Sequence, residues 1–186
     1  MSARDPIVFD TGPLRHFAQQ GWLGVLRFLT AERGAVIPES VEREVQRQAS
    51  NDPRLEQILA DGWLEVDRSS DLEFLVAFSA YEQRIAVGRK SLGECGVLAL
   101  GRVRRWEMVL DDAVPRELAA EQGLRVVGTV RLLCDAVNAR QLTLIMVESL
   151  ADDLLANEYR LPFGPGGFRR FARENGLLSE GDRHSG

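Results

Sequence analysis

The sequence has few of the residues that bind zinc or form disulfides. Two cysteines and two histidines occur in 186 residues. Cys95 and Cys134 lie in apolar, helix-like surroundings and form no paired metal-binding spacing. We therefore expect neither a structural zinc site nor redox chemistry at a cysteine pair.

Long hydrophobic runs are also absent. No apolar run approaches the roughly 18 to 20 residues that cross a bilayer, and the first residues lack the basic-then-apolar layout of a signal peptide. We therefore expect a cytoplasmic protein with no membrane partner. The apolar share of 45% and the charged share of 27% are typical of a compact domain with an adequate core.

An excess of positive charge is lacking too, because the formal net charge is -5. This argues against a protein that holds nucleic acid through a dense basic surface. An acidic enzyme can still cleave nucleic acid if divalent cations reverse the local charge and a restricted set of basic residues positions the phosphates.

Short apolar segments alternate with helical patterns along most of the chain. Helices are expected over residues 22–29, 72–85, 92–103 and 130–139. Alternation of this kind favours a parallel sheet joined by right-handed crossovers. The sequence predicts an α/β fold, a three-layer α/β/α sandwich with a mostly parallel sheet of about five strands. The expected strands lie within residues 6–10, 35–37, 63–66, 107–110 and 124–127.

The pattern changes beyond about Thr143. A helix is expected over residues 144–156, and a stretch rich in proline and glycine at 161–167 separates it from another short helix. We expect residues 1–142 to form the main domain and residues 143–186 to form a helical extension of it, with a disordered tail.

Acidic residues follow two of the expected strands. Asp10 comes directly after the first strand, and Asp111 and Asp112 follow the strand that ends near Leu110. Ligands of open parallel sheets collect where the strands end at their carboxyl edge. Neighbouring carboxylates repel each other unless a cation lies between them, and Mg²⁺ or Mn²⁺ prefers oxygen ligands. The pattern therefore favours a site for a hard divalent cation.

Two further acids lie near the starts of helices. Glu44 follows a strand that exits through Pro38, and Glu94 lies at the first turn of the next helix, where Gly93 and Gly96 are expected to leave open space around it. Each acid alone has an ordinary explanation. Asp10 and Asp112 suit helix N-caps, Ser91 with Glu94 matches a capping box, and Glu44 suits a solvated helix position. A common site is favoured only when the four acids are considered together, in their order along the chain.

With these residues in view, the chain resembles the PIN-domain family of metal-dependent ribonucleases, in particular the short bacterial toxins that are paired with antitoxins. The resemblance covers roughly residues 6 to 140. It rests on the stretches I-V-F-D-T-G-P-L at 7–14, I-P-E-S-V-E-R-E-V at 37–45, S-L-G-E-C-G-V-L-A-L at 91–100 and V-L-D-D-A-V-P-R-E-L-A at 109–119, continuing through E-Q-G-L-R-V-V-G-T-V.

The resemblance implies that residues 1–142 are a PIN-like nuclease domain. The family's catalytic acids fall on Asp10, Glu44, Glu94 and Asp112. Asp10, Glu94 and Asp112, with Asp111 beside them, would bind the metal ion, Mg²⁺ or Mn²⁺. Which aspartate of the pair is the main ligand stays open, and Glu42 is the competing choice for the second acid.

The resemblance also implies supporting residues and partners. Thr11 would support the metal-binding acids through its hydroxyl. Relatives often carry threonine or serine where this chain has Leu110, and Thr129 is a candidate substitute for that missing hydroxyl. Arg102, Arg104 and Arg105 are candidates for contacts with RNA phosphates, although a solvated helix end explains them at least as well. The implied partners are an RNA substrate, a small antitoxin protein and a second copy of the chain.

The implied reaction is hydrolysis of an RNA phosphodiester by metal-activated water. Two alternatives stay open. The absence of a hydroxyl at Leu110 keeps a non-catalytic PIN-like binding or regulatory module in view. A phosphatase of the haloacid dehalogenase type also begins with a strand that ends in aspartate, but it needs a second aspartate two residues later, where this chain has Gly12.

Overall fold

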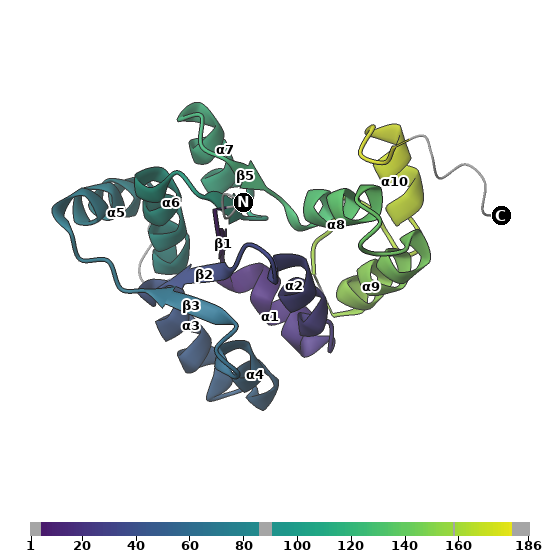
Figure 1. The fold of residues 1–186 in the computed structure, drawn as a ribbon, viewed down its shortest axis with the longest axis horizontal. Helices are drawn as coiled ribbons and strands as arrows, with labels where there is room; N and C mark the ends of the chain where they lie inside the picture. Colours follow the sequence, from purple (N-terminus) through teal and green to yellow (C-terminus); the bar gives the residue numbers. More distant parts are fainter. Residues whose placement is uncertain (1–4, 86–90, 158, 180–186) are drawn as a thin grey trace. The chain divides into compact units, whose positions relative to one another are not determined.

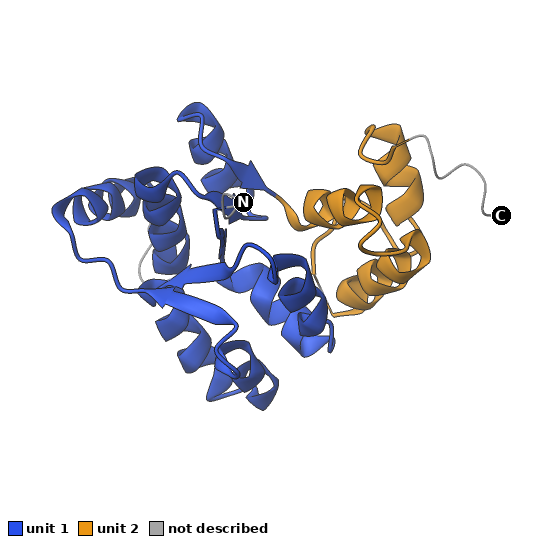
Figure 2. Ribbon diagram, viewed as in Figure 1, with its two compact units in different colours: residues 1–127 blue, residues 128–186 orange. Residues whose placement is uncertain are grey.

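The computed structural model describes residues 5–85, 91–157 and 159–179. By its internal contacts the chain divides into two compact units, residues 1–127 and residues 128–186, here called unit 1 and unit 2 (Figure 2). The disordered tail expected at the C-terminus lies outside the described residues. The division of the chain at residues 142 and 143 into a main domain and an extension stays a prediction.

Unit 1 contains a sheet of five parallel strands in the order β3-β2-β1-β4-β5 (Figure 1). Its central strands are short, β-branched and buried, as continuous apolar runs in parallel sheets usually are. The strands are β1 (Ile7–Phe9), β2 (Ala35–Pro38), β3 (Leu64–Asp67), β4 (Glu107–Val109) and β5 (Val126–Val127). Each strand overlaps a segment that the sequence predicts as a strand.

Helices of unit 1 flank this sheet, which confirms the predicted three-layer α/β/α class (Figure 1). The helix predicted over residues 72–85 has those same bounds, and the one predicted over 92–103 extends one residue further. The helices are α1 (Thr11–Gln19), α2 (Leu23–Thr30), α3 (Glu39–Ala49), α4 (Glu56–Leu59), α5 (Leu72–Ile85), α6 (Leu92–Arg104) and α7 (Ala113–Glu121), with a 3-10 turn η1 (Pro53–Leu55).

The strand order reverses direction beside β1. The chain runs from β1 to β2 and β3 on one side of the sheet, and then places β4 and β5 on the other side. The backbone N–H of Asp10, just past β1, donates to the carbonyl of Val109 at the end of β4, at 3.3 Å. Open parallel sheets bind ligands at such a switch point, outside the carboxyl ends of the strands.

Unit 2 is helical and consists of α8 (Thr129–Asn138), α9 (Leu144–Ala156) and α10 (Phe168–Glu174). Phe163, in the glycine-rich and proline-rich connection, packs against Phe168 and Phe171 of α10, with ring centroids 5.7 Å and 5.3 Å apart. Arg169 of α10 pairs with Glu148 of α9 at 2.8 Å. Across both units, none of the helices that the structure describes is long and apolar enough to span a membrane.

Candidate active site

Acids from four separate parts of unit 1 line one small cavity of about 130 Å³. Asp10 follows β1, Glu44 lies on α3, Glu94 lies in the first turn of α6, and Asp112 precedes α7. These are the four acids that the resemblance selects. The remaining lining residues are Thr11, Gly12 and Arg15.

Asp10 is both a helix cap and an unsatisfied acid. Its Oδ2 accepts a hydrogen bond from the N–H of Gly12 at 3.3 Å, so the predicted N-cap of α1 is present. Its Oδ1 is buried and has no hydrogen-bond partner among the described residues. Burial raises the pKa of Asp10 to about 7, against the lowering effect of the Thr11 and Gly12 N–H groups, and the charges of Glu44 and Asp112 raise it further.

Glu44 is held towards the cavity by its neighbours. Its Oε2 accepts a hydrogen bond from the Thr11 hydroxyl at 3.0 Å, and its Oε1 accepts one from the Gln48 side chain at 3.1 Å. Glu42, the competing second acid, instead binds Arg68 through both carboxylate oxygens at 2.6 Å and 2.9 Å. It is absent from the described lining of the cavity. The structure thus favours Glu44 over Glu42 as the acid of α3 that belongs to this site.

Glu94 and Asp112 face each other across the cavity. Burial, a hydrogen bond with Asp112 and the charges of Asp10 and Asp112 raise the pKa of Glu94 to about 8. Among the described residues, neither Ser91 nor Asp112 makes a side-chain cap hydrogen bond at its helix start. Glu94 does hydrogen-bond with the Ser91 side chain, which partly offsets the raised pKa. Both acids line the cavity, and Asp112 does so without capping α7.

The other residues considered around the fourth acid are not among the described lining residues of the cavity. Asp111 is half-buried and is missing from the described lining of the cavity. Leu110 is buried, with 1% of its surface exposed. Thr129 begins α8 in unit 2, where its hydroxyl shares a hydrogen bond with the Tyr159 hydroxyl at 3.0 Å. Its supporting role towards the acids stays a prediction.

Arg15 is a cavity residue that the sequence reasoning missed. It is the one cationic side chain among the described residues that line the cavity. Its guanidinium lies 2.9 Å from Nε2 of His16, whose pKa is lowered to about 4 by burial and by the charge of Arg15. The imidazole is therefore neutral at pH 7 and can accept this hydrogen bond. No sequence signal singles out Arg15, because an arginine on a helix is ordinarily solvated.

The three arginines predicted to contact RNA lie around the C-terminal end of α6. Arg104 hydrogen-bonds to Ser69 at 2.8 Å and pairs with Asp71 at 3.4 Å. Arg105 ends the helix with a φ of 58°, and Arg102 is exposed. In the described structure, none of the three belongs to the lining of the acid cavity.

The expectation that Gly93 and Gly96 leave open space was wrong, because both glycines lie against other side chains. A Cβ atom on Gly93 would lie 2.6 Å from Oε2 of Glu44 and 3.4 Å from Oγ1 of Thr11. A Cβ atom on Gly96 would collide with the Ser40 hydroxyl. The two glycines instead allow the start of α6 to approach α3 closely, which brings Glu94 and Glu44 to the same cavity.

The donor set fits a hard divalent cation in its chemistry. It consists of carboxylate oxygens around one cavity, and it includes Oδ1 of Asp10, for which the described part of the chain supplies no hydrogen-bond partner. In the described residues, no three Asp, Glu, His or Cys side chains converge closely enough to hold one ion as they stand. Glu44 is turned to Thr11 and Gln48, and Glu94 is turned to Asp112. Side-chain rotation is therefore needed to bring the acids onto one ion.

Comparison with known proteins adds one finding to this geometry. A family model described as a PIN domain matches residues 6–163. No curated protein matches the chain. Proteins with PIN domains are generally nucleases that act on RNA and use divalent metal ions.

Proposed function

Because this chain belongs to the PIN-domain family, we propose that it is a metal-dependent endoribonuclease whose active site is the cavity lined by Asp10, Glu44, Glu94 and Asp112. The observation that carries the proposal is the gathering of these acids, which lie far apart in the sequence, where the strand order of the sheet reverses. Oδ1 of Asp10, which has no hydrogen-bond partner among the described residues, supports it further.

Asp10, Glu94 and Asp112 are the residues that would hold Mg²⁺ or Mn²⁺, with Asp111 as the neighbouring alternative to Asp112. A bound divalent ion supplies two things to phosphodiester hydrolysis: it makes water a better nucleophile and it neutralises charge that develops on the phosphate. Burial raises the pKa values of Asp10 and Glu94 in the chain without an ion. A bound divalent cation would oppose this effect and keep both carboxyl groups ionised.

Glu44 is the acid best placed to act on the water molecule. Thr11 donates a hydrogen bond to Oε2, and Gln48 donates one to Oε1, so the carboxylate has a defined orientation. Glu44 can accept a proton from water as the water oxygen attacks phosphorus. The P–O bond to the leaving oxygen then breaks, and that oxygen takes up a proton from solvent.

Arg15 can bind the substrate phosphate in the same cavity. Its guanidinium is held by the neutral His16 ring at 2.9 Å and retains further N–H donors for phosphate oxygens. A cation at this place offsets part of the repulsion between the RNA backbone and the acids. Arg15 is therefore proposed to stabilise the negative charge that grows on the phosphate during attack.

Within this proposal, the biological role is that of a toxin in a toxin–antitoxin pair. The cytoplasm is the proposed location, and a small antitoxin protein and a second copy of the chain are the proposed partners. The basis is the likeness of the four motif stretches to short bacterial toxins of the family. A short neighbouring gene for a DNA-binding protein that suppresses the RNA cleavage of this chain would support the role.

The nuclease proposal is tested by incubating the purified chain with Mn²⁺ or Mg²⁺ and a panel of RNAs. Asp10→Asn and Glu94→Gln should each abolish cleavage, whereas Glu121→Gln, an exposed acid on α7 that pairs with Arg84, should not. Equal cleavage by wild type and by both active-site variants would mean that a contaminating nuclease or another site is responsible. No cleavage under any condition would favour the non-catalytic alternative, which the buried Leu110 supports.

A phosphatase of the haloacid dehalogenase type is the weaker alternative. Its second aspartate would stand at position 12, and Gly12 lines the cavity there without a side chain to donate a proton. The same assay with a phosphate monoester in place of RNA separates this reaction from nuclease activity.

A further inference from the structure

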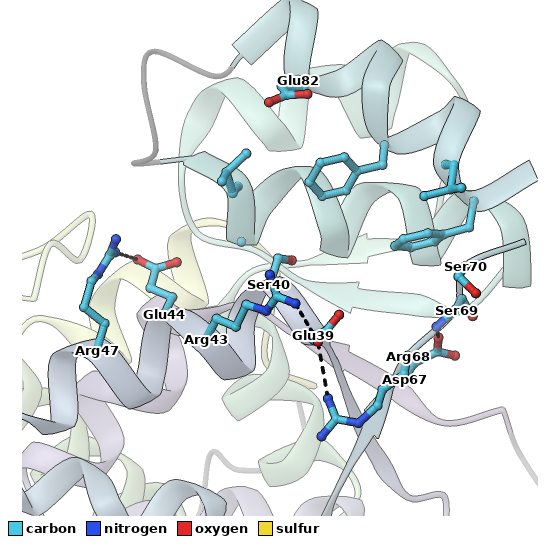
Figure 3. A pocket seen from close by; sticks show the side chains of 15 residues that line it. Glu39, Ser40, Arg43, Glu44, Arg47, Asp67, Arg68, Ser69, Ser70 and Glu82 are labelled. Carbon is cyan, nitrogen blue, oxygen red and sulfur yellow. Dashed lines mark hydrogen bonds and ion pairs between the residues drawn. The ribbon is translucent and has the colours of Figure 1, made fainter. Parts of the chain in front are cut away.

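A second and larger cavity adjoins the acid cavity in unit 1. It has a volume of about 770 Å³ and is here called the α3–α5 groove (Figure 3). Glu44 lines both cavities, and Gly93, which lies against Glu44, lines the groove. A ligand in the groove therefore extends up to one of the four catalytic acids. Its walls come from α3, from the segment after β3, from α5 and from the start of α6.

The lining of the groove carries charges of both signs: Arg43, Arg47 and Arg68, and the acids Glu39, Glu44, Asp67 and Glu82. The arginines on α3 are exposed. Arg43 and Arg47 lie four residues apart on α3, with 72% and 59% of their side-chain surfaces exposed. Arg43 pairs with Glu39 at 2.8 Å, and Arg47 lies 4.0 Å from Glu44 (Figure 3). Exposed ion pairs of this kind contribute little free energy, so either guanidinium can exchange its carboxylate for a phosphate.

The facing wall is apolar. Phe74 and Phe78 of α5 lie with their ring centroids 6.1 Å apart. Leu75, between them in sequence, lines the groove with 51% of its surface exposed. Leu92 at the start of α6 adds to this wall. An apolar surface beside exposed guanidinium groups suits a ligand with a flat apolar part and an anionic part.

A single-stranded nucleotide chain has both parts, whereas a duplex keeps its bases stacked inside. We propose that the α3–α5 groove binds the single-stranded RNA that flanks the cleaved phosphodiester, with bases against Leu75 and Phe78 and phosphates at Arg43 and Arg47. This inference rests on the proposed nuclease function. It places the path of the single-stranded RNA next to Glu44.

The phosphate contacts are tested by fluorescence anisotropy with a labelled single-stranded RNA of about ten nucleotides and the full chain carrying Asp10→Asn, which blocks cleavage under the proposed function. Removing one arginine that binds a phosphate of a single strand lowers the slope of log affinity against log salt by about 0.7. Arg43→Gln and Arg47→Gln should each produce this change. Arg84→Gln, which removes an exposed arginine paired with Glu121 outside the groove lining, should leave the slope unchanged.

The apolar wall is tested with two adjacent residues of α5. Leu75 lines the groove, and Val76, which is 61% exposed, is not among the described lining residues. Both are exposed, so glutamate at either position leaves the core intact. Leu75→Glu should weaken binding of the single strand by about fivefold, because a base loses its apolar contact with the leucine. Val76→Glu should bind like the parent chain, and the same RNA annealed to its complement should bind more weakly to both.

Other occupants of the groove give different results. If Leu75→Glu turns a dimer into a monomer in sedimentation and leaves RNA affinity unchanged, the groove is an interface between copies and the proposal is overturned. The proposal is also overturned if the groove variants and the Arg84→Gln control bind the RNA with the same affinity and the same dependence of affinity on salt. The nuclease itself is tested separately, by assaying RNA cleavage with chains that carry the wild-type Asp10. If cleavage depends on Asp10 but the groove substitutions do not change it, the groove inference fails and the nuclease proposal stands.

Discussion

The Asp10→Asn variant is expected to be more stable than the wild-type chain above neutral pH. Asp10 is 8% exposed, and burial is the main cause that raises its pKa from 3.8 to about 7, with further contributions from Glu44 and Asp112. Asparagine has nearly the same shape and keeps an oxygen that can accept the hydrogen bond from Gly12. It carries no charge that folding must remove from water.

The sign of the effect follows from the two states of the carboxyl group. Below about pH 4 it is protonated in both the folded and the unfolded chain, and Asp10 causes no difference. Between about pH 4 and pH 7 the unfolded chain releases this proton while the folded chain keeps it, so rising pH favours unfolding. Above that range the loss is complete, and a pKa raised from 3.8 to about 7 corresponds to roughly 4 kcal/mol of unfolding free energy.

Urea denaturation in the presence of a chelator measures this difference. Wild type and Asp10→Asn should have equal unfolding free energies near about pH 4, and the variant should gain roughly 4 kcal/mol by about pH 8. For a chain of this size, that gain raises the melting temperature by roughly 10 °C. Asp61→Asn, an exposed aspartate with 70% of its side chain accessible, is the control and should show no such gain. The account of a buried, unsatisfied carboxyl group would be refuted by either of two results. One is equal stability of wild type and Asp10→Asn at about pH 8, and the other is a gain in stability of the variant that is confined to low pH.

The remaining predictions concern the ion and the residues around the acids. Millimolar Mg²⁺ or Mn²⁺ should raise the melting temperature of the wild-type chain more than that of Asp10→Asn, as measured by calorimetry, because the ion binds the folded acids. Arg15→Gln should lower kcat for RNA cleavage by roughly 100-fold while changing RNA affinity much less, if its main contact forms as charge grows on the phosphate. Thr11→Val removes the hydrogen bond to Glu44, so it should cost about 1 kcal/mol in urea denaturation and lower kcat, whereas Thr11→Ser should restore both. Gly93→Ala places a Cβ atom 2.6 Å from Oε2 of Glu44, so it should reduce cleavage while far-ultraviolet circular dichroism stays unchanged.

The fold was predictable because buried parallel strands leave a simple pattern. Ile7–Phe9 and Ala35–Pro38 are continuous short apolar runs bounded by turn or helix-start residues, and both became central strands. The shortest strand, Val126–Val127, lies at the edge of the sheet, where pairing on one side only makes its bounds hardest to predict. Helix lengths followed the apolar periodicity, as α5 and α6 illustrate.

The site was predictable only in part. Asp10 and Asp112 follow strands, so their meeting follows from the rule that parallel strands end at one edge of the sheet. The motif resemblance selected Glu44 over Glu42, and the structure adds the reason: Glu42 pairs with Arg68, a residue 26 positions away. Such a pairing between distant positions has no local signature. The same reason hides Arg15, whose place beside the acids is set by how α1 lies at the cavity.

The glycines of α6 link the fold to the chemistry. Gly93 and Gly96 were expected to leave open space near Glu94, yet the space above each is filled by side chains of α1, α3 or the end of β2. Without a Cβ at position 93, Oε2 of Glu44 can lie beside the backbone of α6, one residue from Glu94. A Cβ atom there would lie 2.6 Å from Oε2 of Glu44, so the Glu44 carboxylate would have to move from its place beside Glu94. The glycine therefore keeps Glu44, the acid proposed to accept a proton from water, beside Glu94, one of the acids proposed to hold the ion.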